Sequence, residues 1–209
     1  MKRVIKLYQI DYGERIVFKR KIDNIYQVLI DKETKEEILY KDNNTKDEYA
    51  RHSMFFEEES LDSIIKILEE DLKDAKEFAK EKFKGAVDKA GVNYFKGHIS
   101  SVAKGTKTLQ GEIVAYLHDI IEDTDVNYEE ILDRFGYQTA QAVNYLTHRK
   151  NTPYLEYVEK LKVNPIAREV KMSDLTNNMD LSRLKEITDK DRKRLEKYKK
   201  AYVILEDER

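Results

Sequence analysis

The stretch Ala115–Asp125, AYLHDIIEDTD, places a His–Asp pair and a Glu–Asp pair two residues apart at the end of an apolar run. Residues four apart share one face of a helix, so His118 would lie over Glu122 if the helix continued to Asp123. The same spacing would place Asp119 over Asp123. Adjacent residues are about 100° apart around a helix, so His118 and Asp119 can still reach one ion beside the helix end. This imidazole and this carboxylate are suited to a metal site with nitrogen and oxygen ligands.

Two side chains elsewhere in the chain are candidates to complete such a site. His98 lies in YFKGHISSVA, before the start of another apolar helix, and Asp174 lies in VKMSDLTNNM, as an acid inside an apolar stripe. With the His–Asp pair they form a mixed set that suits Mn²⁺, Fe²⁺ or Zn²⁺ better than Ca²⁺, which prefers oxygen ligands alone. The other histidines, His52 and His148, have no partner in the sequence, and His52 is expected at the surface.

Each of these residues also has an ordinary structural explanation. A single His or Asp on a helix is more often hydrogen-bonded or solvated than bound to a metal. Asp174 could pair with Lys171, three residues earlier on the same helix surface. The segment EDTD could end one helix and cap the next, and Asn177 and Asn178 could cap the end of theirs. The metal hypothesis therefore depends on the conjunction of the four residues.

The N-terminal part of the chain has the pattern of short strands. Up to about Lys41, runs rich in Val, Ile, Tyr and Phe alternate with turn residues, which predicts a β-meander. The runs are RVIKLYQI, RIVFKR and NIYQVLI, with EEILYK as a further candidate strand. Residues 42–59 are polar and poorly patterned, which indicates a linker. Three or four short strands are marginally stable alone, so we expect them to pack against the rest of the chain or against a partner.

From about Ser60 onward, apolar residues recur with the period of helices. The predicted helices are SLDSIIKILEEDL, LKDAKEFAKEKFKGAV, GEIVAYLHDII, NYEEILDRFG, QTAQAVNYL, TPYLEYVEKL, NPIAREVKMSDL and TDKDRKRLEKYKKAYVIL. Asn127 and Glu130 have the spacing of a capping box, and Gly136 marks a helix end. Asn164–Pro165 combines a cap with a proline in the first turn. The sequence predicts a mainly α protein, with a β-rich appendage and linker at 1–58 and a helical domain at 59–209.

Composition narrows the class of protein. The 209 residues are 40% apolar, enough for one full core and a small appendage. There is no cysteine, which excludes disulfides and thiolate metal sites and suits a reducing cytoplasm. The net charge of −2 gives no basic field for nucleic acid. The N-terminus lacks the pattern of a signal peptide, and no apolar run approaches the roughly 18 residues of a membrane span. We therefore expect a cytoplasmic protein.

Four stretches, in order, resemble the HD-domain phosphohydrolases, and among these the RelA/SpoT-type hydrolases of (p)ppGpp. The stretches are AKEFAKEKFKGAVDKAGVNYFKGH, AYLHDIIEDTDVNYEEILDRFG, YLTHRKNTPYLEYVEKLKVNP and AREVKMSDLTNNMDL. The second matches the most specific signature of the family nearly throughout, and the third is like a segment of small stand-alone members. The resemblance extends over about 72–184, which is about half of the chain, and implies an HD-domain helical bundle.

The resemblance also implies roles for individual residues. The implied metal ligands, usually of Mn²⁺, are His98, His118, Asp119 and Asp174. The acids implied to activate the attacking water and relay its proton are Glu122 and Asp123. The residues implied to contact the nucleotide or its phosphates are Lys89, Arg149, Lys150 and Asn178.

The chain also departs from the family pattern. Ile99 follows the first His where the family usually has Pro, and one extra residue separates Gly91 from that His. MSDLTNNM replaces LADRLHNM, and Asp88–Lys89 replaces an Arg-Lys or Arg-Ser pair in the loop that recognises guanine. The metal and water apparatus is therefore expected to be intact and the part that recognises the base to be altered.

The resulting functional hypothesis is a Mn²⁺-dependent 3′-pyrophosphohydrolase of guanosine 3′-polyphosphates, the alarmones of the stringent response. The altered base loop motivates an alternative, a phosphomonoesterase or phosphodiesterase of other nucleotides. A third hypothesis is a non-catalytic module that senses a nucleotide while its β-rich N-terminus binds a partner. The expected partner is a nucleotide, with no nucleic acid and no membrane, and a homo-oligomer is left open.

Overall fold

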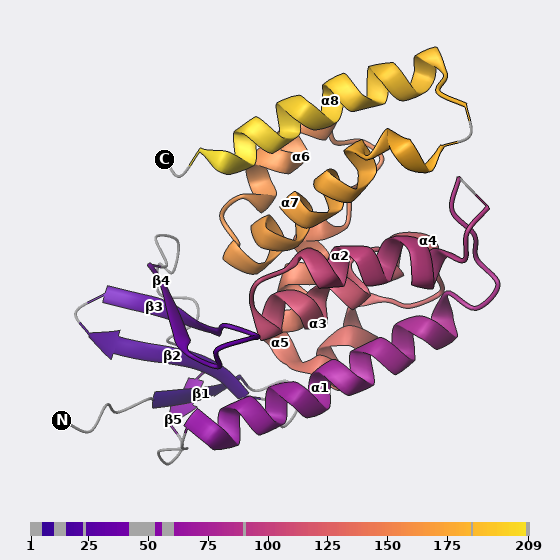
Figure 1. The fold of residues 1–209 in the computed structure, drawn as a ribbon. Coiled ribbons are helices and arrows are strands. Elements are labelled where there is room, and N and C mark those ends of the chain that lie inside the picture. The colour runs from indigo at the N-terminus through magenta and orange to yellow at the C-terminus, as the bar shows by residue number, and fades with distance from the viewer. Residues whose placement is uncertain are drawn as a thin grey trace.

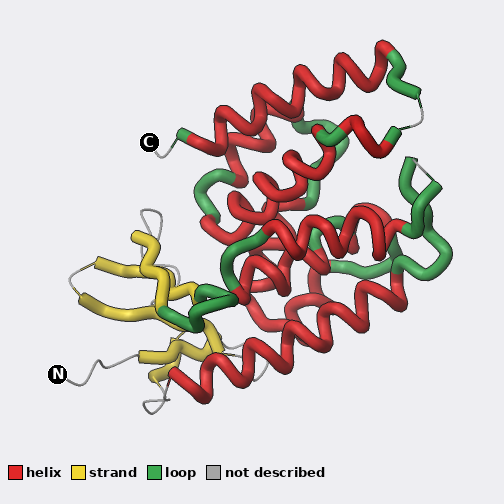
Figure 2. Tube along the Cα trace, in the orientation of Figure 1, coloured by secondary structure: helices red, strands yellow, loops and turns green. Residues whose placement is uncertain are grey.

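The computed structural model describes residues 6–10, 16–22, 24–41, 53–55, 61–89, 91–184 and 186–207. Most of these residues are helical, so the prediction of a mainly α protein is confirmed (Figures 1 and 2). The helices are α1 (Leu61–Lys82), the π-helix η2 (Phe95–Ile99), α2 (Ser100–Gly105), α3 (Leu109–Leu117), α4 (Ile120–Asp123), α5 (Tyr128–Leu146), α6 (Tyr154–Leu161), α7 (Pro165–Met179), the 3₁₀-helix η3 (Leu181–Arg183) and α8 (Asp189–Glu206). In the described ranges, none of the helices combines the length and the apolar character that crossing a membrane requires.

The N-terminal strands form one antiparallel sheet in the order β4-β3-β2-β1-β5. The strands are β1 (Lys6–Ile10), β2 (Ile16–Ile22), β3 (Asn24–Ile30), β4 (Glu37–Lys41) and β5 (Ser53–Phe55). Consecutive strands from β1 to β4 pair with one another. The linker predicted over 42–59 is wrong in one part, because β5 lies inside it and pairs with β1. The pairing partner is far away in the sequence, so local polarity could not reveal this strand.

The end of β3 is attached to the corner between α2 and α3. The Ile30 N–H donates to Gln110 Oε1 at 3.0 Å, and the Lys32 N–H donates to the Lys107 carbonyl at 3.0 Å. The side chain of Ile30 is 1% exposed and belongs to the helical core. Hydrogen bonds and apolar burial therefore both join the sheet to the helices at this point.

Helix ends follow the local signals in the sequence. Asn127 Oδ1 accepts from the Glu130 N–H at 2.9 Å at the start of α5, and Asn164 Oδ1 accepts from the Ala167 N–H at 2.9 Å before Pro165. The two helices predicted on either side of Gly136 meet at a kink within α5, where Gly136 has the non-helical angles φ 77° and ψ 173°, so a helix does end at this residue. A side chain would strain this left-handed conformation, so glycine is what the kink requires.

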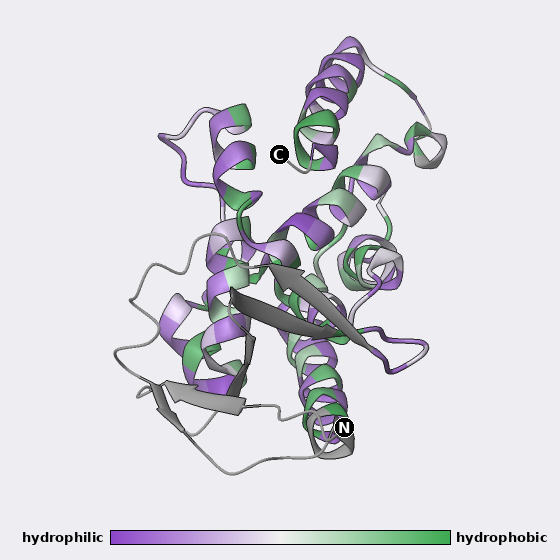
Figure 3. Ribbon diagram, turned by 90° about the vertical axis from the view of Figure 1, so that its left-hand side faces the viewer, coloured by the Kyte–Doolittle hydropathy of each residue, from purple (hydrophilic) through white to green (hydrophobic). Residues whose placement is uncertain are grey.

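The core surrounds α3, whose apolar side chains are buried on all sides. α1 and α7 both pack on α3; α1 contributes Ala75, Phe78 and Ala79 to the core, and α7 contributes Ile166 and Val170. Figure 3 shows hydrophobic and hydrophilic residues interleaved around the helices, as expected of amphipathic elements around one core. Because α3 and α7 carry candidate ligands, this packing also positions the site.

The contact between α5 and α1 offers a test of the packing. Arg134 donates from Nε and Nη2 to Asp74 at 2.8 and 2.6 Å, and its guanidinium lies 4.1 Å from the centre of the Phe78 ring. Lysine cannot reproduce the paired bonds or the stacking. We expect Arg134→Lys to lower the free energy of unfolding by about 1 kcal/mol in urea denaturation. The exposed Arg192→Lys serves as the control, and equal stability of the two variants would contradict the prediction.

Candidate metal centre and active site

The four predicted metal ligands meet at one point of the helical bundle. They come from η2 (His98), the end of α3 (His118), the next residue (Asp119) and the middle of α7 (Asp174). His98 Nε2 lies 3.3 Å from His118 Nε2. It lies 3.4 Å from Asp119 Oδ2 and 3.4 Å from Asp174 Oδ1. His118 Nε2 lies 3.0 Å from Asp119 Oδ2. Residues 76 positions apart in the sequence (174 − 98) thus present donor atoms to one small volume.

The backbone at the His–Asp pair differs from the expected continuous helix. α3 ends at Leu117, and α4 begins only at Ile120. Between them Asp119 has φ −101° and ψ 0°, a sparsely populated conformation that is frequent in active sites. The helix predicted through Ile121 is therefore interrupted at His118–Asp119, and the condition of a continuous helix to Asp123 is not met. The break removes the 100° divergence of neighbouring helical residues, so Asp119 can turn toward His118 Nε2.

The two imidazoles are held so that their Nε2 atoms face each other. His98 Nδ1 contacts Asn177 Oδ1 at 2.9 Å, and His118 Nδ1 contacts the Ala115 carbonyl at 2.7 Å. A carbonyl oxygen only accepts, so each Nδ1 carries the proton and each Nε2 of a neutral ring presents a lone pair. The idea that Asn177 caps its helix is wrong, since α7 continues to Met179 and Asn177 orients His98 instead.

The spacing of these atoms fits a divalent cation. Ligand atoms about 2.1 Å from one ion lie about 3.0 Å apart at a right angle and about 3.4 Å apart at the tetrahedral angle. The four measured separations lie between 3.0 and 3.4 Å. Two facing lone pairs and two carboxylates would otherwise repel one another in a mostly buried place. The donor set of two nitrogens and two carboxylates suits Mn²⁺, Fe²⁺ or Zn²⁺.

Electrostatics also indicate a position that attracts positive charge. Burial lowers the pKa of His118, but Asp119 and Asp174 more than offset this effect and raise that pKa to about 9. Burial raises the pKa of Asp119, and His118 and His98 more than offset this and hold it well below the usual range. Tyr94 donates from its hydroxyl to Asp119 Oδ2 at 2.6 Å, and burial and the Asp119 charge raise the pKa of this phenol. A bound cation would replace a proton here.

The two acids of α4 lie beside this centre. Glu122 Oε1 accepts from the backbone N–H of His148 at 2.5 Å. Burial raises the pKa of Glu122, and the Asp119 charge adds to the effect. The same two causes raise the pKa of Asp123. Both side chains remain exposed to the cavity described below, so water can reach them. Carboxyl groups with raised pKa values next to a metal site are suited to proton transfer.

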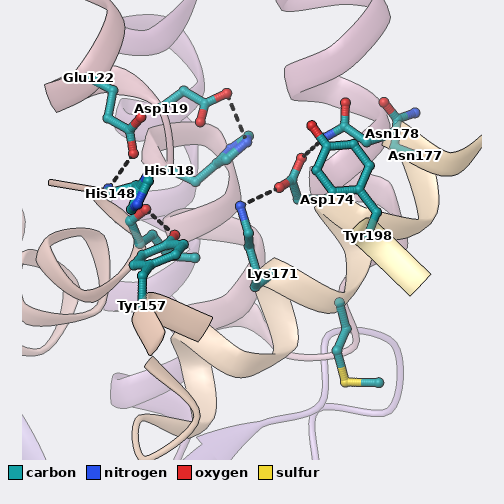
Figure 4. Close-up of polar contacts among 12 residues, drawn as sticks. His118, Asp119, Glu122, His148, Tyr157, Lys171, Asp174, Asn177, Asn178 and Tyr198 are labelled. Carbon is teal, nitrogen blue, oxygen red and sulfur yellow. Dashed lines mark hydrogen bonds and ion pairs between the residues drawn. The ribbon is translucent and has the colours of Figure 1, made fainter. Parts of the chain in front are cut away.

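Asp174 has two neighbours in addition to His98. Lys171 Nζ lies 2.8 Å from Asp174 Oδ2, so the ion pair considered from the sequence is present. It lies inside the protein rather than on the helix surface, with the Lys171 and Asp174 side chains 14% and 6% exposed. Asn178 Nδ2 donates to Asp174 Oδ1, the oxygen that faces His98 (Figure 4). The ion pair uses Oδ2, so it is compatible with a metal at Oδ1.

A cavity of about 410 Å³ opens over the centre. Of the predicted substrate residues, Lys89 and Asn178 line it. Arg149 and Lys150 are not among its lining residues, and the Arg149 guanidinium donates to Asn144 Oδ1 at 2.9 Å instead. The lining residues not foreseen from the sequence include Tyr94, Tyr154, Lys171, Arg194 and Tyr198. In the sequence, the only indication for Arg194 and Tyr198 is weak: they are four residues apart and so lie on one face of a helix. His52 lies outside the described residues.

The cavity is bridged at one side by Lys89 Nζ and Asp191 Oδ1, 3.3 Å apart. Hydrogen bonds from the side chain and backbone of Thr188, with Lys89 adding to them, lower the pKa of Asp191 to about 2. The unfolded chain has a value of about 3.9, so ionised Asp191 stabilises the folded protein at higher pH.

This stabilisation should be complete above pH 4 and should be lost as the pH falls toward 2. We therefore expect Asp191→Asn to lower the thermal midpoint at pH 7 and to have a smaller effect at pH 3. The exposed Asp189→Asn is the control. A difference between wild type and Asp191→Asn that does not change with pH would contradict this assignment.

The chain is similar to a curated protein and to a solved structure. No family model matches the chain. An 82-residue segment is 42% identical to a guanosine-3′,5′-bis(diphosphate) 3′-pyrophosphohydrolase of Aquifex aeolicus (strain VF5). The match covers 37% of this chain and only 12% of that relative's length.

The second match is to a solved structure described as a metazoan ortholog of SpoT that hydrolyzes ppGpp and plays a role in starvation responses. It has a TM-score of 0.53 and 22% identity, and covers 65% of this chain and 85% of that one. At this identity, the match shows a shared fold. The segment match and the fold match agree with the resemblance inferred from the motifs: a segment of this chain is similar in sequence to a 3′-pyrophosphohydrolase, and the fold is similar to that of the SpoT ortholog.

Proposed function

We propose that the protein is a Mn²⁺-dependent hydrolase that removes the 3′-pyrophosphate of guanosine 3′,5′-bis(diphosphate). The observation that carries the proposal is that the donor atoms of His98, His118 and Asp174 converge, with Asp119 beside them, next to a cavity that two further carboxyl groups line. The names of the two relatives supply the substrate class.

The proposed metal ligands are His98, His118, Asp119 and Asp174. A divalent ion held there would lower the pKa of a bound water, to about 7 in favourable zinc sites. Glu122 takes the proton of the attacking water and orients that water toward phosphorus. The bond between the 3′-oxygen and phosphorus breaks, pyrophosphate leaves, and Asp123 relays a proton to the 3′-oxygen. The two acids titrate as a pair because they are adjacent.

Cationic side chains of the cavity would bind the phosphates. Arg194 donates from Nε and Nη2 to the Tyr198 hydroxyl at 3.2 and 2.8 Å, and has no ion-pair partner among the residues that the structure describes. Its charge is therefore available to a phosphate group. Lys89 and Asn178 line the same cavity and are proposed to contact the nucleotide. Arg149 and Lys150 would need a movement of their loop to contribute.

A second candidate function is a phosphomonoesterase or phosphodiesterase of other nucleotides. The observation in its favour is the loop Asp88–Lys89, where Lys89 is paired with Asp191 rather than presented as part of the basic pair that the family uses for guanine. A different base would then occupy this side of the cavity.

The proposal extends to the organisation of the chain. Residues 59–209 would be the hydrolase domain, and residues 1–58 a β-rich appendage to it. The protein would act on its nucleotide in the cytoplasm, as part of the stringent response. This activity requires no nucleic acid and no membrane, and it is compatible with a homo-oligomer.

One experiment tests these functions together. The purified protein is analysed for bound metal and then incubated with Mn²⁺ and either ppGpp or a panel of other nucleotides, with the products separated by chromatography. Pyrophosphate released from ppGpp supports the proposal. Inorganic phosphate released from monophosphates supports the second function instead. Metal-free protein without turnover of any nucleotide would favour a non-catalytic sensor.

A further inference from the structure

We propose that His148, which has no assigned role in the hydrolase, is the positioning residue for Glu122. The inference rests on the proposed function, in which Glu122 takes a proton from water. His148 belongs to the segment 147–153, between α5 and α6, and its ring is half-buried. It is the only His of the described residues that lies outside the metal centre.

The first step is the contact with Glu122. The backbone N–H of His148 donates to Glu122 Oε1 at 2.5 Å, across 26 residues of sequence. No other hydrogen bond reaches the Glu122 carboxylate from the described part of the chain. This single bond therefore determines how the carboxylate is oriented, and it leaves Oε2 free to accept a proton.

The second step is what holds this N–H in place. His148 Nε2 lies 2.7 Å from the Thr152 carbonyl, which only accepts, so Nε2 carries a proton and donates. The Thr152 N–H donates in turn to the Arg149 carbonyl at 3.0 Å. The segment is thus closed on itself, and the imidazole of His148 is the side chain that closes it.

The third step is the support under the imidazole. The His148 ring centre lies 4.7 Å from that of Tyr157 and 5.8 Å from that of Tyr154, the latter edge to face (Figure 4 shows Tyr157 beside His148). The hydroxyl of Tyr157 donates to the Leu146 carbonyl at the end of α5. Aromatic packing on α6 therefore keeps the ring in place, and the ring keeps the backbone N–H aimed at Glu122.

The chain offers a matched set of substitutions. In His148→Gln the side-chain amide can donate from nearly the position of Nε2, whereas His148→Leu has similar bulk and no donor. Asn151→Ala changes an exposed side chain of the same segment and serves as the control. All four proteins are assayed for ppGpp hydrolysis at saturating Mn²⁺, with metal content and thermal midpoint measured in parallel.

We expect His148→Leu to lower kcat by about 10- to 100-fold, because a displaced general base loses much of its effect. KM should stay within about twofold and metal content should be unchanged. His148→Gln should recover most of the wild-type kcat, and Asn151→Ala should equal wild type. The inference is overturned if His148→Leu keeps its kcat, if His148→Gln falls as far as His148→Leu, or if the loss is in KM.

A readout without catalysis separates this inference from the proposed function. In ¹H–¹⁵N spectra, a hydrogen bond to a carboxylate shifts the amide proton of residue 148 downfield. We expect this shift in wild type and His148→Gln, and its loss in His148→Leu and in Glu122→Ala. If the wild-type protein hydrolyses no nucleotide, the proposed function is wrong. The spectra still show whether the His148 N–H donates to Glu122. If the amide proton of residue 148 has the same shift in wild type, the two His148 variants and Glu122→Ala, the contact with Glu122 is absent.

Discussion

An Asp174→Asn protein is expected to bind Mn²⁺ more than about 100-fold more weakly than wild type and to lose hydrolysis to at least the same extent. Asp174 Oδ1 lies 3.4 Å from His98 Nε2, and an amide cannot supply the negative charge of this ligand. Substitution of a residue that only orients a metal ligand commonly lowers metal affinity or activity 10- to 100-fold. Substitution of a direct ligand should lower them further. Isothermal titration with Mn²⁺ and a ppGpp assay measure the two effects.

The buried Lys171 requires its own control in this experiment. Asp174→Asn leaves the Lys171 ammonium without its counter-charge, and breaking a buried ion pair costs about 3–5 kcal/mol. The double variant Asp174→Asn with Lys171→Met removes this penalty and should regain thermal stability in the presence of a chelator. It should still fail to bind Mn²⁺. The exposed Asp133→Asn should behave as wild type. Full Mn²⁺ affinity in the double variant would exclude Asp174 as a ligand.

A Glu122→Gln protein is expected to keep its metal and lose turnover. The amide can still accept the His148 N–H at Oε1, so the local structure should persist, but it cannot take a proton from water. General-base catalysis contributes about 10²–10⁴-fold, and kcat should fall by this factor with Mn²⁺ affinity unchanged. Single-turnover kinetics and metal titration on the same sample provide the measurement.

The matched control for Glu122→Gln is Glu129→Gln, an exposed acid in the first turn of α5. It removes the same charge from the same region without changing the cavity. Normal hydrolysis by Glu122→Gln would remove Glu122 from the mechanism. Loss of metal in this variant would instead make Glu122 a ligand and would require a different base, with Asp123 the nearest acid.

Together these variants distinguish a residue that binds the metal ion, Asp174, from a residue that takes the proton of the attacking water, Glu122. Substitution of a ligand should lower metal affinity and activity together, whereas substitution of the base should lower activity alone. If both variants lost metal to the same degree, the division of roles between α7 and α4 would be wrong.

The sequence by itself determined the parts of this protein that depend on neighbours along the chain. The helical period of the apolar residues predicted α1, α3, α5, α6, α7 and α8, but not the short helix α4. The caps at Asn127 and Asn164 placed the starts of two of them. The candidate ligands also came from the sequence, because two imidazoles and two carboxylates form a donor set that suits a divalent cation and the family resemblance implied the same four residues.

Only the tertiary structure decided what depends on contacts between distant segments. The helix breaks at Asp119 and so turns its carboxylate toward His118, although local spacing favoured a continuous helix. Asn177 orients His98 across 79 residues of sequence instead of capping its own helix. The expectation that Arg149 contacts phosphate came from the family resemblance, whereas in the structure its guanidinium donates to Asn144 Oδ1 and does not line the cavity.

The physical reason is the range of the forces involved. Helix propensity, capping and amphipathic period act within about four residues, so a single sequence displays them directly. The burial of Lys171 beside Asp174 and the contact between His148 and Glu122 exist only after α4 and α6 have packed on α5 and α7 has packed on α3. The sequence thus predicted which kinds of ligand atoms the site contains, whereas tertiary packing determined how these atoms are oriented.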